Sequence, residues 1–157
     1  MTKRAIFPGT FDPFTNGHLD IVRKGLDLFD EIVIAIGVNA LKKTMFDLET
    51  RKRWIEECFS TEPKVKVDSY SGLTINYCDQ IDARFILRGL RTIADFEYEK
   101  QIAMVNSDLN PSIQSIFVLS EQKYTAVSST VIRDLIVHGG DYTQYLPDAV
   151  KVEQARP

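Results

Sequence analysis

Short apolar runs alternate along this 157-residue chain with segments whose apolar residues recur at helical spacing. The runs are rich in Ile, Val and Phe, residues that favour strands, and they span Arg4–Phe7, Glu31–Val38, Val65–Tyr70, Arg84–Leu87 and Ser115–Leu119. Strands that alternate with helices predict parallel pairing, because a parallel connection needs a long crossover. The pattern therefore predicts an α/β fold.

Apolar positions three or four residues apart predict the helices of the first half of the chain. The first helix turns these residues toward the sheet: Leu19, Val22, Leu26 and Phe29. Asp47 can cap a second helix from about Leu48 to Phe59, and a short third helix covers Leu73 to Ile81. The elements together predict a Rossmann-like open five-stranded parallel sheet with helices on both faces.

Three more helices are expected in the second half. The fourth ends before Pro111, since the residue preceding proline disfavours helical dihedrals, and it is marked by Tyr98, Ile102, Val105 and Leu109. Ser128 can cap a fifth helix that ends at Gly139 and Gly140, with these side chains pointing inward: Val131, Leu135 and Ile136. Pro147 suits the first turn of a last, short helix.

Composition narrows the class of protein. With 44% hydrophobic residues and no repeat or linker, residues 1–157 are expected to form a single domain. The apolar runs Ala5–Phe7 and Ile32–Val38 are too short for a signal peptide or a membrane span, so a cytoplasmic protein is expected. Cys58 and Cys78 lack metal-like spacing and are expected as reduced thiols. The net charge of −3 argues against a nucleic-acid partner.

The loops that follow the five strands gather glycine, hydroxyl and basic groups. Ligands of open α/β sheets bind beyond the carboxyl ends of the strands, where these loops meet: Pro8–His18, Lys42–Lys43, Ser71–Thr74, Arg88–Arg91 and Tyr124–Thr130. Backbone amides, hydroxyls and cations that converge in this way favour a polyphosphate site. Each loop alone is also explained as a tight turn, a solvated lysine pair or a helix cap.

The two histidines of the chain occupy different positions. His18 follows Gly17 at the start of a helix, where the partial positive charge attracts phosphate. His138 lies near a helix end and is expected on the surface. Two distant histidines and two scattered cysteines do not form a ligand set, so no metal-binding residues are expected.

Gly9-Thr10-Phe11-Asp12-Pro13 with Thr15-Asn16-Gly17-His18 resembles the signature of the nucleotidyltransferase superfamily, whose T/H-x-G-H element binds nucleotide phosphates. Over nearly its full length, the chain is further similar to the bacterial phosphopantetheine adenylyltransferases, through Arg88–Arg91, Asp95–Glu99 and Val127–Thr130 in the expected order. That resemblance implies the penultimate step of coenzyme A synthesis, in which ATP and 4′-phosphopantetheine give dephospho-coenzyme A and pyrophosphate. It also implies a homohexamer made of two trimers.

The resemblance also implies roles for individual residues. The catalytic residues would be His18, Thr10, Lys42 and Arg88. ATP would contact Thr10, Phe11, His18, Gly89, Leu90, Arg91, Glu99, Tyr124, Thr125, Ala126, Val127, Ser128, Ser129 and Thr130. The phosphopantetheine would contact Thr10, Lys42, Leu73, Thr74, Arg88 and Asn106. Thr130 stands where serine is also common in the family, and Thr74 where a larger apolar residue often occurs.

The implied reaction needs no general base, because the attacking phosphate is already anionic at neutral pH. Catalysis then consists of aligning an in-line attack on the α-phosphorus and stabilising the charge that develops. Mg²⁺ would arrive with ATP, held mainly by phosphate oxygens and water.

Three alternatives stand beside this interpretation. A related nucleotidyltransferase would use another donor, or another acceptor such as nicotinate mononucleotide or a sugar or glycerol phosphate; the motifs from Arg88 onward argue against it. A non-catalytic nucleotide or coenzyme A binding module would release no pyrophosphate. A nucleic-acid binder related to class I aminoacyl-tRNA synthetases would need an anticodon-binding segment, which does not fit in this length.

Overall fold

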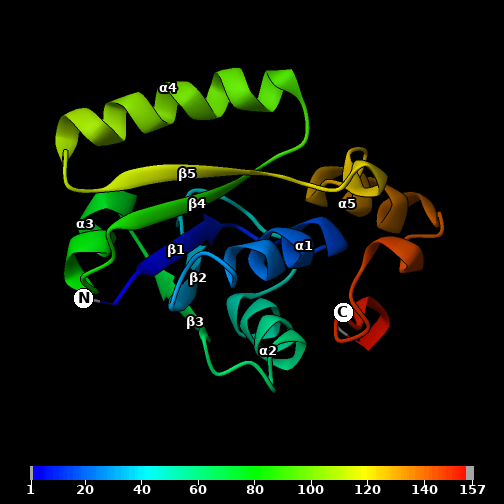
Figure 1. Cartoon of the computed structure of the whole chain (residues 1–157). Coiled ribbons are helices and arrows are strands. Elements are labelled where there is room, and N and C mark those ends of the chain that lie inside the picture. Colours follow the sequence, from blue (N-terminus) through cyan, green and yellow to red (C-terminus); the bar gives the residue numbers. More distant parts are fainter. Residues whose placement is uncertain (1, 155–157) are drawn as a thin grey trace.

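A computed structural model describes residues 2–154, and its five strands form one all-parallel sheet (Figure 1). The strands are β1 (Arg4–Gly9), β2 (Glu31–Gly37), β3 (Val65–Tyr70), β4 (Phe85–Leu90) and β5 (Gln114–Leu119). Their spatial order is β3-β2-β1-β4-β5, so the direction of winding reverses between β1 and β4. The predicted five-stranded parallel sheet is confirmed, with small shifts at several strand ends.

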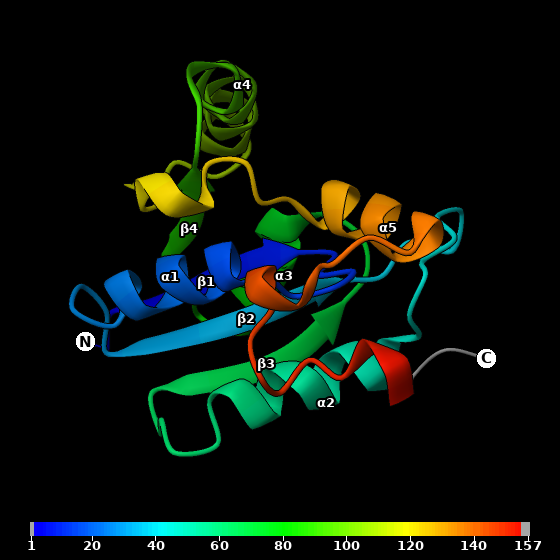
Figure 2. The same ribbon diagram turned by 90° about the vertical axis from the view of Figure 1, so that its right-hand side faces the viewer.

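Helices cover both faces of this sheet, as predicted (Figures 1 and 2). One face packs against α1 (Asn16–Gly25), α2 (Leu48–Cys58) and α5 (Ser129–His138). The other face carries α3 (Thr74–Gln80) and α4 (Ile93–Leu109). Three 3₁₀ helices complete the described chain: Gln122–Tyr124, Thr143–Tyr145 and Val152–Gln154. Within residues 2–154 no helix has both the length and the apolar character to cross a membrane.

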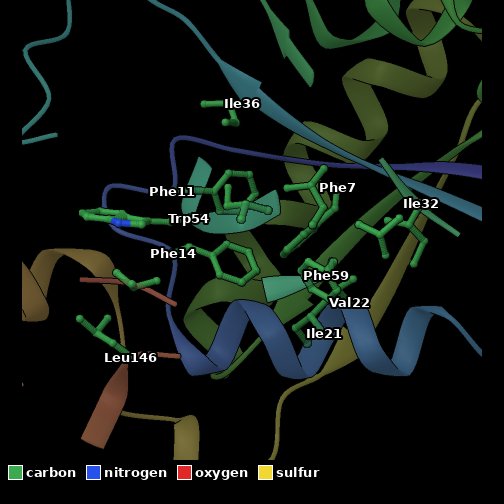
Figure 3. Packing of buried hydrophobic residues seen from close by; sticks show 14 of the residues in the cluster. Phe7, Phe11, Phe14, Ile21, Val22, Ile32, Ile36, Trp54, Phe59 and Leu146 are labelled. Carbon is green, nitrogen blue, oxygen red and sulfur yellow. The ribbon is translucent and has the colours of Figure 1, made fainter. Parts of the chain in front are cut away.

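Alternate side chains of β2 divide between two cores, because successive residues of a strand point to opposite faces. Ile32, Ile34 and Ile36 enter the larger core beneath α1 and α2. Val33 and Ala35 enter the smaller core beneath α3. Figure 3 shows the aromatic part of the larger core, where rings from β1 and the following loop pack together. Each fully buried isoleucine or valine side chain contributes about 1.5–3 kcal/mol to the stability of the fold.

Capping residues fix the helix ends as the sequence predicts. The Asp47 carboxylate accepts the Thr50 N–H at 2.7 Å, and the Ser128 hydroxyl accepts the Val131 N–H at 3.2 Å. Gly139 ends α5 with a φ of 73°, in the left-handed region that glycine adopts without strain. The fourth helix ends at Leu109, before its proline.

Three expectations about the helices are wrong in detail. The first helix ends at Gly25, so Leu26 is its C-cap and Phe29 reaches the core from the turn beyond it. Val131 is 46% exposed while its neighbour Ile132 is fully buried, because each helical residue advances by about 100° and the inward stripe runs through Ile132 instead. Pro147 lies in a turn between two 3₁₀ helices and starts no helix of its own.

The carboxyl ends of β1 and β4 separate at the middle of the sheet. β1 pairs with β4 only at Ala5 and Ile6, whereas it pairs with β2 as far as Gly9. Pro8 lies beyond the last pair with β4, so its missing N–H breaks no bond on that side and the strand continues past Phe7, where the sequence predicts its end. A gap of this kind, at the point where strand order reverses, is where open α/β sheets bind ligands.

Candidate functional site

Two hollows meet at the gap between β1 and β4. The larger has a volume of about 490 Å³ and lies between the starts of α1 and α5 and the loop after β4. The smaller has a volume of about 250 Å³ and lies between the ends of β2 and β3 and the helices α3 and α4. Both are lined by Pro8, Gly9, Thr10, Arg88 and Glu99. Two ligands bound in the two hollows would therefore meet at this shared wall.

His18 is held in one tautomer by the start of α1. Its Nδ1 accepts the backbone N–H of Thr15 at 3.0 Å, and the Thr15 hydroxyl accepts the His18 backbone N–H at 3.4 Å, which completes a capping box. Because Nδ1 accepts a hydrogen bond, the proton of the neutral imidazole is on Nε2. His18 lines the larger hollow, so Nε2–H is the donor that it can offer to a ligand there.

Aromatic rings surround the imidazole of His18. The ring centroids of Phe7, Phe11 and Phe14 lie 6.2, 5.1 and 5.3 Å from it, and Figure 3 shows these three phenylalanines packed in the core beside α1. Burial, with the nearby charges of Arg91 and Arg88, lowers the pKa of His18 to about 3. The imidazole is therefore a neutral donor throughout the physiological range.

Two helix N-termini open on the larger hollow and carry no acidic residue in their first turns. These are α1, through Gly17 and His18, and α5, through Ser128 and Ser129. The first turns of α2 and α4 each contain an acidic residue instead. Free backbone N–H groups and the helix dipole attract anions at such ends. The larger hollow is consequently suited to a chain of phosphates.

Lys42 reaches the shared wall of the two hollows from the loop after β2. Its Nζ donates to the Thr10 hydroxyl at 3.0 Å. Asp12 fixes this loop, because its two carboxylate oxygens accept hydrogen bonds from the backbone N–H groups of Met45 at 2.8 Å and Phe46 at 2.9 Å. Asp12 therefore positions the segment that presents Lys42.

Arg51 ties the same loop to the end of β1. This side chain is only 4% exposed, and its Nη1 donates to the Thr10 carbonyl at 2.6 Å while Nε donates to the Phe46 carbonyl at 3.0 Å. Arg133 approaches from α5 and donates to the Asp12 carbonyl at 2.7 Å. These bonds join the loop after β1, the loop before α2 and helix α5 next to Thr10.

Arg88 lies in the shared wall between the two hollows. Its Nε donates to Glu99 at 2.7 Å, its Nη2 forms a second bond to the same carboxylate, and its Nη1 donates to the Pro8 carbonyl at 2.7 Å. A guanidinium has five N–H donors, so two remain after these contacts. They are enough to hold a phosphate with two hydrogen bonds. Glu99 is 9% exposed, and its charge is satisfied by Arg88.

The loop after β4 supplies a second cation and a close backbone approach. Arg91 pairs with Asp95 at 3.1 Å and donates to the Val127 carbonyl at 3.2 Å, which ties the β4 loop to the segment before α5. Gly89 packs against α1 so closely that a Cβ there would lie 2.7 Å from Ile21 Cγ1. A larger residue at this position would require the Ile21 side chain to move.

Most of the sequence-predicted site residues line the two hollows. The predicted ATP contacts that line the larger hollow are Thr10, Phe11, His18, Gly89, Arg91, Glu99, Val127, Ser128 and Ser129. The predicted contacts that do not line it are Leu90, Tyr124, Thr125, Ala126 and Thr130. Of the predicted acceptor contacts, the smaller hollow is lined by Thr10, Thr74, Arg88 and Asn106. Lys42 lines the larger hollow instead, and Leu73, 59% exposed, lines neither.

Sequence reasoning missed four residues of this region. Asp12 and Arg51 support the loops from within, and Tyr70 lines the smaller hollow from the end of β3. Ser120 lines the larger hollow, and its buried hydroxyl makes no hydrogen bond to residues 2–154, so it is free for a ligand or water. The signal for Asp12 was a carboxylate in a loop of phenylalanines, which is costly to bury without partners.

Comparison with known proteins identifies relatives over most of the chain. Residues 6–135 match the cytidylyltransferase-like family. The phosphopantetheine adenylyltransferase of Flavobacterium johnsoniae is 55% identical over 152 residues, covering 97% of this chain and 99% of that one. The phosphopantetheine adenylyltransferase of Phocaeicola vulgatus is 48% identical over 151 residues, covering 96% of this chain and 99% of the relative.

Among solved structures, one similar chain is a bifunctional NMN adenylyltransferase/ADP ribose pyrophosphatase from Francisella tularensis, complexed with AMP and a manganese ion. The TM-score is 0.68 at 19% identity, which shows the shared fold alone, and the match covers 93% of this chain and 44% of the longer one. The close relatives extend over almost the full length of both chains, with the glycine-histidine element and the later motifs inside the match. The chain therefore belongs to the phosphopantetheine adenylyltransferase family.

Proposed function

We propose that the chain transfers AMP from ATP to 4′-phosphopantetheine, giving dephospho-coenzyme A and pyrophosphate. The observation that carries the proposal is the shared wall of the two hollows, which Thr10 and Arg88 line and which Lys42 reaches through its bond to the Thr10 hydroxyl. ATP occupies the larger hollow and the acceptor arm the smaller one. The α-phosphorus and the attacking phosphate then meet at the wall that both substrates reach.

In the larger hollow, neutral and cationic hydrogen-bond donors hold the triphosphate of ATP. His18 donates Nε2–H to an oxygen of the α-phosphate. The Thr10 hydroxyl and the free backbone N–H groups of α1 donate hydrogen bonds to the same phosphate. Arg91 and the amides at Ser128 and Ser129 hold the β and γ phosphates. Because the His18 imidazole stays neutral, it stabilises the growing charge on oxygen without transferring a proton.

The acceptor side holds the attacking phosphate with Lys42 and the two free N–H donors of Arg88. This phosphate is already an anion, so the two cations align it and reduce its repulsion from the α-phosphate. Glu99 contributes by fixing the guanidinium of Arg88. The step forms a bond from the acceptor oxygen to the α-phosphorus and breaks the bond to pyrophosphate.

Mg²⁺ accompanies ATP in this proposal. Residues 2–154 contain no group of three or more histidine, cysteine or acidic side chains placed to hold a metal ion. The ion would be held mainly by phosphate oxygens and water. When bound, it neutralises charge on the leaving pyrophosphate.

The proposal extends to assembly and location. The chain acts as one nucleotidyltransferase domain in the cytoplasm, and its free thiols Cys58 and Cys78 agree with a reducing compartment. The proposed assembly is a homohexamer. Association is supported by α4, which stands out from the sheet in Figures 1 and 2 and exposes these apolar residues: Ile93, Tyr98, Met104, Val105 and Leu109. Light scattering should give about six times the chain mass of 17.9 kDa; a monomer mass would contradict the assembly.

Pyrophosphate release tests the function. The purified chain is incubated with ATP, Mg²⁺ and a panel of phosphorylated acceptors. We expect release with 4′-phosphopantetheine and little with nicotinate mononucleotide or glycerol phosphate. Faster release with nicotinate mononucleotide would reassign the acceptor, and release with no acceptor at all would indicate hydrolysis of ATP. Binding of ATP without any release would favour the non-catalytic module.

A further inference from the structure

A pair of hydroxyl groups lines the smaller hollow at the end of β3. The oxygens of Tyr70 and Thr74 lie 2.9 Å apart and share one hydrogen bond. Both residues line the hollow, Tyr70 from the last position of β3 and Thr74 from the first position of α3. The pair thus stands opposite α4, across the space proposed for the acceptor arm.

The Tyr70 ring rests on a rigid support. It stacks on Tyr77 with ring centroids 4.8 Å apart and an angle of 17° between the planes. Tyr77 is 5% exposed, and its hydroxyl donates to Asp68 at 2.7 Å. Burial and the hydrogen bond to Asp68 raise the pKa of Tyr77, so the hydroxyl stays protonated and the support stays in place. The position of the Tyr70 hydroxyl is consequently fixed before any ligand binds.

The two hydroxyl groups together can still bind a polar ligand. Each carries one proton and two lone pairs, and their mutual bond uses one proton and one lone pair. One O–H donor and several lone pairs remain. The rest of the wall offers apolar contacts from Ile86, Ile102 and Ala103, together with the Asn106 side chain, which makes no hydrogen bond to the described residues.

An alkyl chain in this hollow would leave those polar groups without partners, at a cost in free energy. An amide supplies both kinds of partner, since its carbonyl accepts and its N–H donates. We infer that Tyr70 and Thr74 form a specificity-determining pair that selects an amide-bearing acceptor arm. This inference rests on the proposed function, and it names the part of the acceptor that the smaller hollow recognises.

The test compares two acceptors in wild type and in Tyr70→Phe/Thr74→Val, where both side chains keep their shape and lose their hydroxyl groups. One acceptor is 4′-phosphopantetheine, and the other is an alkyl phosphate of similar length without amides. The ratio of their kcat/KM values measures selection of the amides. In the double variant we expect this ratio to fall about fivefold to tenfold, since one neutral hydrogen bond contributes about 1 kcal/mol. The Michaelis constant for the amide-bearing acceptor should account for the change, while the Michaelis constant for ATP should be unaffected.

Tyr145→Phe is the matched control, since it removes a tyrosine hydroxyl that lines neither hollow and does not support Tyr70. Its ratio should equal that of wild type. The single variants Tyr70→Phe and Thr74→Val should give effects that do not add, because each disturbs the same hydrogen bond. An unchanged ratio in the double variant, with wild type active on 4′-phosphopantetheine, would overturn this inference alone. Wild type inactive on 4′-phosphopantetheine would overturn the proposed function and the inference together.

Discussion

Lowering the pH from 7 to 5 is expected to destabilise the folded chain through His18. The folded-state pKa of about 3 lies below the ordinary value of 6.5, because the half-buried ring packs against phenylalanines that shield it from water, near two arginines. Between those values the unfolded chain binds a proton that the folded chain excludes, so the free energy of unfolding falls as the pH falls. A pH of 5 is about 1.5 units below the ordinary pKa of histidine in the unfolded chain, which corresponds to a loss of about 2 kcal/mol in the free energy of unfolding.

Urea unfolding followed by fluorescence of the buried Trp54 measures this loss. Wild type and His18→Gln are compared at pH 7 and pH 5 at one protein concentration, because any assembly couples to stability. The stability of wild type relative to the variant should fall by about 2 kcal/mol between the two pH values. His138→Gln is the matched control at an exposed helix end. If the difference in stability between wild type and His18→Gln does not change with pH, the half-buried, neutral imidazole on which the donor role depends is refuted.

Three further substitutions follow from the site. His18→Ala should lower kcat by about 10²- to 10³-fold with a smaller change in ATP affinity; full activity, or a loss explained by a lower melting temperature, would remove His18 from the mechanism. Arg88→Ala should lower kcat/KM for the acceptor by about 30-fold or more while ATP titration by calorimetry stays near normal; an equal loss of ATP affinity would reassign Arg88 to the donor. Asp12→Asn leaves one oxygen where two backbone N–H groups now bind, so a thermal melt should show a loss of about 1–3 kcal/mol, and displacement of Lys42 should raise the Michaelis constant for the acceptor; if neither the melt nor that constant changes, Asp12 does not have the support role.

The spacing of apolar residues was sufficient to predict the strands and helices of this fold. It was insufficient to predict which strands lie side by side in the sheet. The apolar run of β2 is buried on both faces, so its strand character is clear from composition. No pattern within one strand specifies which strand lies beside it, and the order β3-β2-β1-β4-β5 comes only from the structure. Pro8 is a similar case, because proline is tolerated in β1 only where pairing with β4 has ended.

The site was predictable where local sequence carries the geometry. His18 follows a glycine at a helix start, which favours a phosphate contact, and the structure places it in the wall of the larger hollow. The ion pair of Arg88 with Glu99 joins β4 to α4, and the bonds from Asp12 and Arg51 join three loops. Such contacts depend on how separate elements pack, and no spacing in the sequence encodes them.

Isotope transfer tests the central claim most directly, namely that the α-phosphate of ATP passes to the acceptor phosphate at the shared wall. Wild type is supplied with 4′-phosphopantetheine and ATP labelled at the α-phosphorus, and a parallel reaction contains ATP labelled at the γ-phosphorus. The α label should appear in dephospho-coenzyme A, and the γ label should appear only in pyrophosphate. An α label that remains in free AMP, or a γ label that enters the acceptor product, would contradict adenylyl transfer by this chain.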